Sequence, residues 1–204
     1  MSNEQIEFWT RDYTEEYLER NSVFDFDLGV KGWKQITSKI ETPKKILECG
    51  CNIGRNINFL NSVFPNATKS IIEVAKQPFD IVTSKYSFEL AQNASIIDSD
   101  LPQTYFDLVF THSVLIHINP EELVTNMKKI YDYSSRYIIL CEYFNRTPVM
   151  IEYRNQLNKL FKSDFGKTFI TNFEVSLVDY GFLWGHVYDP AGFDDITYWV
   201  FEKK

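Results

Sequence analysis

The stretch from Lys44 to Phe64 reads KKILECGCNIGRNINFLNSVF and combines a short apolar run, a turn with two glycines and a helix-like segment. Apolar residues recur at helical spacing after Arg55. A strand that passes into a helix in this way opens a parallel sheet with helices on its faces. Because ligands of such sheets bind beyond the carboxyl ends of the strands, this turn is the natural place for a ligand.

From Lys44 onward, β-rich runs alternate with helix-like segments, which is the pattern of an α/β protein. The expected strands cover residues 44–50, 69–75, 88–97, 106–114 and 136–144, and the expected helices cover 55–64, 77–87, 120–135 and 151–165. The helix over 120–135 has start signals, with Asn119 as its cap, Pro120 in its first position and Glu122 completing the capping box.

The chain closes with two aromatic runs, VSLVDYGFLW (175–184) and DITYWVFEKK (195–204), that have no helix between them. They predict an antiparallel pair at one edge of the sheet. We therefore predict a Rossmann-like, doubly wound α/β fold with a mostly parallel seven-stranded sheet, an antiparallel final strand and N-terminal helices. Trp9, Tyr13 and Tyr17 share one face of the first predicted helix, and we expect residues 1–42 to form a lid or cap on a domain spanning 43–204.

Composition limits the class of protein. The 204 residues are 44% hydrophobic and 16% aromatic, which indicates one globular domain with a sizeable core. A net charge of −7 argues against a nucleic-acid partner. The polar N-terminus and the lack of long apolar runs predict a soluble, cytoplasmic protein without a membrane partner.

The turn itself excludes several ligands. A phosphate-binding loop needs Gly-Lys-Ser/Thr where this chain has Arg55 and Asn56, and the dinucleotide pattern G-x-G-x-x-G fails from Gly50 onward. Cys49 and Cys51 are not joined by a second cysteine or histidine cluster, so we predict no metal site.

The turn matches E-x-G-x-N-x-G at Glu48, Gly50, Asn52 and Gly54, and it resembles the loop of the class I methyltransferases that use S-adenosylmethionine. Their usual form is E/D-x-G-x-G-x-G. Asn tolerates positive φ, so the turn can keep its shape with Asn52 in place of the middle glycine.

Further cofactor contacts are expected at the ends of neighbouring strands. Glu73 lies about 20 residues beyond the turn, where an acid can bond the ribose hydroxyls. In the resembled class the third strand ends near a residue that contacts adenine, which implies Asp98, with Asp100 as a rival. Cys51 and Thr111 complete the expected cofactor-binding set.

Several segments are similar to a narrower group, the methylases associated with pseudaminic acid biosynthesis. They are ECGCNIGRN, FDLVFTHSVLIHINPEEL, ILCEYFNRTPV, LFKSDFG and the C-terminal LVDYGFLW with DDITYWVFEKK. This resemblance implies methyl transfer from S-adenosylmethionine to a small molecule, a nonulosonic sugar acid or its precursor or derivative, on an oxygen or a nitrogen.

An acceptor hydroxyl would need a general base, for which histidine is suited near neutral pH. We rank His117 first, ahead of His112 and His186, with a purely packed histidine as the alternative. Candidate substrate contacts are Tyr17, Tyr143, Arg146 and Arg154, because arginine can grip a carboxylate with two bonds. A nucleotide-dependent oxidoreductase and a binding module without turnover remain alternatives, since a fold does not fix a function.

Overall fold

The computed structural model describes residues 8–9, 23–153 and 156–204. In chain order the elements are α3 (Phe26–Ile36), β1 (Lys45–Cys49), α4 (Arg55–Val63), β2 (Thr68–Ile72), α5 (Lys76–Lys85), β3 (Ala91–Gln92), β4 (Phe106–His112), the 3-10 turn η2 (Leu115–His117), α6 (Leu123–Tyr133), β5 (Ser134–Glu142), β6 (Val149–Tyr153), β7 (Gln156–Lys162), α7 (Phe165–Asn172), β8 (Val175–Leu183), α8 (Gly185–Tyr188), η3 (Asp189–Ala191) and β9 (Ile196–Lys203).

Within the described residues, the central sheet has seven strands in the order β3-β2-β1-β4-β5-β9-β8. The first five strands run parallel, and β9 lies antiparallel between β5 and β8. This arrangement confirms the predicted doubly wound sheet with an antiparallel final strand.

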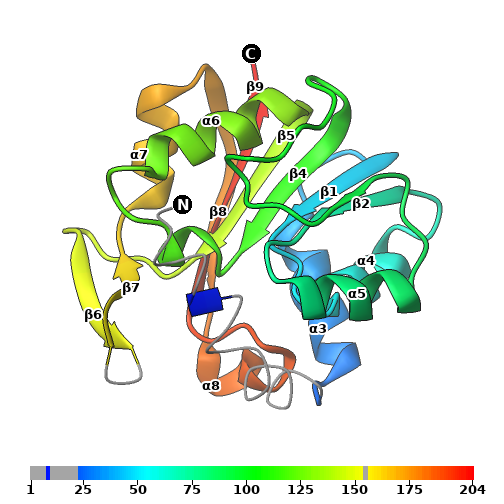
Figure 1. Ribbon diagram of the computed structural model, residues 1–204, viewed down its shortest axis with the longest axis horizontal. Coiled ribbons are helices and arrows are strands. Elements are labelled where there is room, and N and C mark those ends of the chain that lie inside the picture. The colour runs from blue at the N-terminus through cyan, green and yellow to red at the C-terminus, as the bar shows by residue number, and fades with distance from the viewer. Residues whose placement is uncertain (1–7, 10–22, 154–155) are drawn as a thin grey trace.

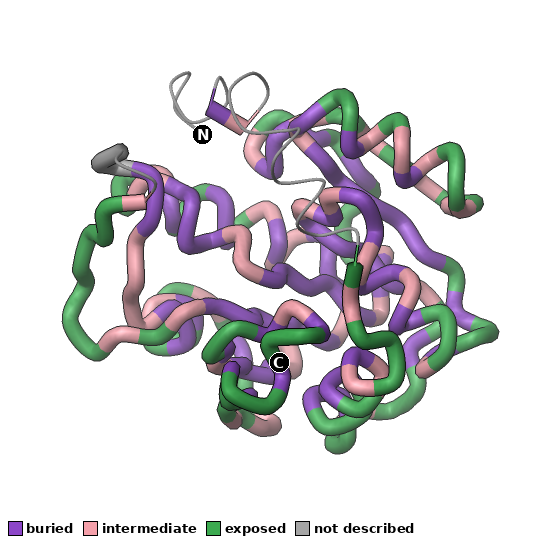
Figure 2. Tube along the Cα trace, turned by 90° about the horizontal axis from the view of Figure 1, so that it is seen from below, coloured by how far each residue is buried: buried purple, intermediate pink, exposed green. Residues whose placement is uncertain are grey.

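Helices cover both faces of this sheet (Figure 1). On one face, α6 and α7 pack on the strands through side chains such as Met127, Ile130 and Phe169. On the other face, α3 and α4 pack through Trp33 and Phe59. Buried residues follow the interior strands, and exposed residues lie on the outer turns (Figure 2). The hydrophobic core therefore lies in two layers, one on each side of the sheet.

The helix α3 is built into the core. Asp25 caps it by accepting a hydrogen bond from the Leu28 N–H over 2.9 Å. Gly29 is required where α3 crosses α4, because a Cβ there would lie 2.3 Å from the Phe59 ring. The other predicted N-terminal helix, with Tyr13 and Tyr17, lies outside the described residues, so a lid formed by residues 1–42 stays a prediction.

The helix predicted over 151–165 is wrong. This region contains the strands β6 and β7, which pair with each other in a separate two-stranded sheet. Met150 lies opposite Phe161, and Ile151 lies opposite Leu160. Such apolar cross-strand pairs stabilise a hairpin, and here they outweigh the helical spacing seen in the sequence. The hairpin stands apart from the central sheet (Figure 1).

Two boundaries also differ from expectation. The strand predicted over 88–97 is reduced to Ala91–Gln92, and the side chain of Asn93 instead bonds the carbonyl of Glu73 over 2.8 Å. The helix α6 begins at Leu123 without a side-chain cap, because Asn119 closes a preceding turn by accepting a hydrogen bond from the Glu121 N–H. Polar side chains that bond nearby main chain compete with regular structure in both places.

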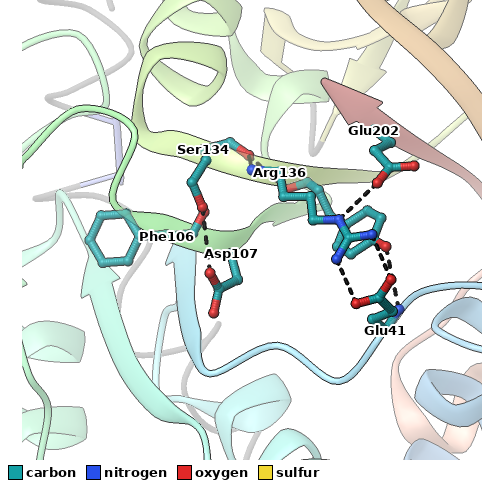
Figure 3. Close-up of polar contacts among 8 residues, drawn as sticks. Glu41, Phe106, Asp107, Ser134, Arg136 and Glu202 are labelled. Atoms are coloured by element: carbon teal, nitrogen blue, oxygen red, sulfur yellow. Dashed lines mark hydrogen bonds and ion pairs between the residues drawn. The ribbon is translucent and has the colours of Figure 1, made fainter. Parts of the chain in front are cut away.

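The end of the sheet opposite the carboxyl ends of the parallel strands is tied by ion pairs. The Arg136 guanidinium donates to both carboxylate oxygens of Glu41 over 2.7 Å and to Glu202 over 2.8 Å (Figure 3). These contacts join β5 and β9 to the segment that leads from α3 into β1. Across the described residues we find no helix whose length and apolar character would let it span a membrane.

Candidate functional site

The order in which strands are added to the sheet reverses between the adjacent strands β1 and β4. From β1 the order proceeds outward to β2 and β3, and the chain then returns to β4 on the other side of β1. Such a switch point opens a crevice at the carboxyl ends of the strands. A cavity of about 400 Å³ lies there. Its lining includes Gly50, Cys51, Asn52, Arg55, Asn56, His112, His117, Tyr143, Tyr153 and Leu160.

The turn after β1 uses left-handed backbone at three positions. The φ angles are 80° at Gly50, 49° at Asn52 and 82° at Gly54. The Asn52 side chain helps to hold this conformation, because its Oδ1 accepts a hydrogen bond from the Ile53 N–H over 2.6 Å. Asn52 therefore has the positive φ that the loop requires of a residue in place of the middle glycine.

Both glycines of the turn are also fixed by packing. A Cβ on Gly50 would lie 2.6 Å from Val114, and a Cβ on Gly54 would lie 2.5 Å from Val82. In this conformation the space beside each glycine is filled by a protein side chain. The turn is thereby docked on one side against the segment that follows β4 and on the other against α5.

Glu73, just beyond the end of β2, stabilises the turn through hydrogen bonds to the main chain. Its Oε2 accepts a hydrogen bond from the Asn52 N–H over 2.6 Å, and its Oε1 accepts one from the Ala75 N–H over 2.9 Å. Burial raises the pKa of Glu73, and these hydrogen bonds oppose the rise. Glu73 is only 7% exposed and does not line the cavity. Asp98 is exposed, also lies off the cavity wall, and bonds the Ser95 hydroxyl.

Glu48 lies fully buried under the turn. Its Oε1 accepts a hydrogen bond from the Asn56 amide over 2.8 Å, and the Asn56 carbonyl oxygen in turn accepts one from the Trp33 indole over 3.2 Å. Its Oε2 has no hydrogen-bond partner in the described part of the chain. Burial raises the pKa of Glu48 to about 8. Glu48 therefore links the turn to α4 and α3, and the sequence analysis missed the linking residue, Asn56.

The two remaining residues predicted to bind cofactor differ in position. Cys51 lines the cavity beside Gly50 as a free thiol with a strongly raised pKa, caused mainly by burial. Thr111 is fully buried next to the end of β4 and is not part of the cavity lining.

His117 sits on the cavity wall at the end of η2. Its Nδ1 lies 2.7 Å from the main-chain carbonyl oxygen of Lys159 on β7. Since a carbonyl only accepts, Nδ1 carries the proton and Nε2 keeps its lone pair. The ring packs edge-on against Trp9 at 4.5 Å and lies 5.7 Å from Tyr153. Burial lowers the pKa of His117 to about 4, so the imidazole is neutral at pH 7.

Glu142, the last residue of β5, fixes the segment that carries His117. Its carboxylate accepts hydrogen bonds from the N–H groups of Val114, Leu115 and Ile116 over 3.1 to 3.3 Å. Burial raises the pKa of Glu142 to about 7, and these bonds oppose the rise. The Glu142 carboxylate is therefore directed into the fold, onto the main chain of the segment that carries His117.

His112, at the end of β4, faces the same cavity from the strand side. Thr111 pairs with Cys49, which places His112 beside Gly50. Its Nε2 is buried and has no hydrogen-bond partner among the residues described. An unsatisfied buried polar atom costs about 1–3 kcal/mol. Burial, with a contribution from the Arg55 charge, lowers the pKa of His112 to about 3.

Of the residues predicted to contact the substrate, the structure describes two, Tyr143 and Arg146, and only Tyr143 lies at the cavity. Tyr143 lines the cavity, and its hydroxyl donates to Asp194 over 3.3 Å. Arg146 is exposed and lies off the cavity wall, while Tyr17 and Arg154 lie outside the described residues. Tyr153 and Leu160 contribute to the wall instead. The sequence analysis missed them because it interpreted 151–165 as a helix.

Comparison with known proteins identifies the fold. No protein-family model matches the chain, and no curated protein matches its sequence. Solved structures match over most of the chain. A Leishmania major S-adenosylmethionine-dependent methyltransferase is 17% identical, with a TM-score of 0.74 over 97% of this chain and 81% of that one.

Two further structures extend this similarity. The 1,6-didemethyltoxoflavin N1-methyltransferase of Burkholderia thailandensis is 10% identical, with a TM-score of 0.70 over 98% of this chain and 86% of its own. A sugar N-methyltransferase from Streptoalloteichus is 11% identical, with a TM-score of 0.63 over 88% of each chain. The chain thus has the Rossmann-like fold found in class I methyltransferases.

Proposed function

We propose that this protein is an S-adenosylmethionine-dependent methyltransferase that acts on a small molecule. The observation that carries the proposal is the left-handed turn from Gly50 to Gly54. It lies at the carboxyl end of β1, is tied to Glu73 through the Asn52 N–H, and borders a cavity that a neutral His117 also lines. The fold supports the same conclusion.

The residues of the turn fit the cofactor. The cavity beside the turn offers His112 Nε2, a buried polar atom without a hydrogen-bond partner among the described residues, and the cationic side chain of Arg55. We propose that the turn from Gly50 to Gly54 and Glu73 would hold the cofactor. Asp98 and Thr111 are proposed as further contacts. When bound, S-adenosylmethionine supplies an activated methyl group on a sulfonium.

His117 is proposed as the general base. Its Nε2 lone pair can take the proton from an acceptor hydroxyl or amine as that oxygen or nitrogen gains the methyl group. The Lys159 carbonyl fixes the required tautomer, and Glu142 holds the segment in place. Positioning supplies much of the acceleration, because a methyl transfer needs the acceptor atom in line and at near-attack distance.

For the acceptor we propose a nonulosonic sugar acid, or its precursor or derivative. This rests on the sequence resemblance to the pseudaminic acid-associated methylases. Tyr143, which lines the cavity, supports a contact with the acceptor. Arg146, Arg154 and Tyr17 are proposed to contact the acceptor or cover it, together with a lid formed by residues 1–42.

The test is a methyl-uptake screen read by mass spectrometry. Sugar acids, their nucleotide-activated forms and amino-sugar precursors are incubated with the protein and S-adenosylmethionine. The proposal expects one acceptor class to gain the mass of one methylene. Uptake by unrelated small molecules, with none by any sugar, would overturn the sugar assignment and leave methyl transfer intact.

A further inference from the structure

The edge strand β8 carries exposed apolar side chains that the proposed function does not use. β8 pairs with β9 on one side, and no other strand of the described residues pairs with its outer edge. Single exposed apolar residues are ordinary, but a group of them on one element marks an interaction surface. The large apolar side chains on and beside β8 that are 44–67% exposed include Phe144, Leu177, Tyr180, Phe182 and Trp184.

The aromatic residues of β8 point to the face of the sheet on which α6 and α7 pack. Tyr180 lies directly opposite Trp199 of β9, and Trp199 belongs to the core layer beneath these two helices. Side chains two residues apart on a strand share a face, so Phe182 lies beside Tyr180. The backbone is still extended at Trp184, with φ −71° and ψ 120°. The aromatic face therefore continues beyond the area that the helices cover.

Two further side chains enlarge this face. A bulge shifts the register of β8 just after Leu177, and Leu177 lies opposite Phe201, which belongs to the same core layer as Trp199. The ring centroid of Phe144 lies 6.2 Å from that of Trp199. The five exposed residues thus gather on one side of the sheet edge. We call them the β8 patch: Phe144, Leu177, Tyr180, Phe182 and Trp184.

The β8 patch carries no charge. Asp179 is the one charged residue of β8, and it lies opposite Val200, which packs in the core layer on the other face of the sheet. An apolar surface needs an apolar partner, and the net charge of −7 disfavours the anionic surface of a membrane. A second copy of the chain meets this requirement, because two-fold symmetry lets the same surface serve both partners.

The size of the β8 patch suits a weak dimer. An aromatic side chain buries about 150–250 Å². The four aromatic members are 45–67% exposed, so together with Leu177 they present about 500 Å² to solvent. Two copies would bury about 1,000 Å², which is the lower limit for a specific interface. An interface of this size is compatible with a Kd of about 10 µM.

We propose that the β8 patch is the interface of a homodimer, in which the patches of two copies pack face to face about a two-fold axis. The bulge after Leu177 disrupts the regular edge of β8, which favours packing of side chains over joining two sheets edge to edge. This interface is independent of methyl transfer, so its presence or absence leaves the proposed function as it stands.

Sedimentation velocity of the full chain tests the interface. From about 1 to 300 µM the wild type should show a reversible monomer–dimer equilibrium. Tyr180→Asp and Phe182→Asp should each weaken it about tenfold or more, because the symmetry brings two like charges into an apolar contact. Both side chains are more than half exposed, so the fold does not depend on them. The control Val124→Asp, at an exposed position in the first turn of α6, should leave the Kd within about twofold.

A second measurement needs no charged variant. Diluting the wild type from about 300 to 1 µM should shift the tryptophan emission to longer wavelength as Trp184 returns to water, and Trp184→Phe should remove that shift. A wild type that stays monomeric at about 300 µM would overturn the proposal, as would a dimer that both aspartate variants leave intact. Binding of the monomer to vesicles of neutral phosphatidylcholine, lost in Tyr180→Asp, would also overturn it and assign the β8 patch to a membrane.

Discussion

The main-chain N–H of Asn52 donates to the Glu73 carboxylate over 2.6 Å, which joins the turn after β1 to the acid that follows β2. A second N–H, from Ala75, reaches the other oxygen of the same carboxylate. Glu73 therefore has a structural role: it stabilises the left-handed turn whether or not it also contacts a ribose.

The first prediction concerns this carboxylate. Glu73→Gln offers one carbonyl oxygen to two N–H groups, so one of them loses its acceptor. An unmet buried donor costs about 1–3 kcal/mol. We expect the free energy of unfolding to fall by about that amount in urea titrations. Glu121→Gln, at an exposed position before α6, should be neutral. Equal stability of Glu73→Gln and wild type would contradict the structural role of Glu73.

The second prediction concerns the backbone at Asn52. Asn52→Gly should leave the stability within about 1 kcal/mol of wild type, because glycine adopts positive φ without strain. Asn52→Val should lose about 1–2 kcal/mol or more, because a β-branched residue is disfavoured there. Denaturant unfolding of the pair checks the difference. Indistinguishable stabilities would show that the turn does not need left-handed backbone at this position.

The third prediction concerns catalysis. Once an acceptor is known, His117→Gln should lower kcat by about 100-fold or more, the usual contribution of a general base. The binding of S-adenosylhomocysteine, measured by calorimetry, should stay within about twofold, since His117 acts on the acceptor. A variant with full kcat would mean that His117 only packs against Trp9, Tyr153 and the Lys159 carbonyl.

The fourth prediction concerns pH and stability. The pKa of His117 is about 4 in the folded protein and has an ordinary value of 6.5, so the unfolded chain binds the proton first as the pH falls. Lowering the pH from 8 to 5 should therefore cost the wild type about 2 kcal/mol that His117→Gln does not lose. Groups that both proteins share cancel in the comparison.

Paired unfolding curves at the two pH values measure this difference. The raised pKa values of Glu48 and Glu142 act in the opposite sense, but they are present in both proteins. A stability difference that does not change with pH would show that His117 is not buried as a neutral imidazole.

Strong local patterns predicted the sheet. The alternation of strands and helices, and the two adjacent aromatic runs at the C-terminus, predicted a mostly parallel seven-stranded sheet with an antiparallel final strand, which the structure has as β9. The prediction failed where cross-strand pairing overrode local spacing. Residues 151–165 have helical periodicity, yet Met150 and Ile151 find partners in Phe161 and Leu160, and a single sequence does not reveal such pairs.

For the site, the motif located the turn and the end of the sheet but not the contacts. Glu48, Gly50, Asn52 and Gly54 were expected to meet the ligand. In the structure Glu48 bonds Asn56, and the two glycines make room for Val114 and Val82. Tertiary packing decides these partners. The same holds for Arg55, whose position depends on Gly192, a residue far away in the sequence.

The most direct test of the central claim is calorimetric titration of the protein with S-adenosylmethionine and S-adenosylhomocysteine. We expect saturable binding of both ligands with one site per chain. Gly50→Arg should abolish it, because even a Cβ at Gly50 would lie 2.6 Å from Val114 and arginine does not tolerate the left-handed backbone. If the folded wild-type protein shows no binding at about millimolar ligand, its binding free energy is weaker than about −4 kcal/mol. That result would contradict the account.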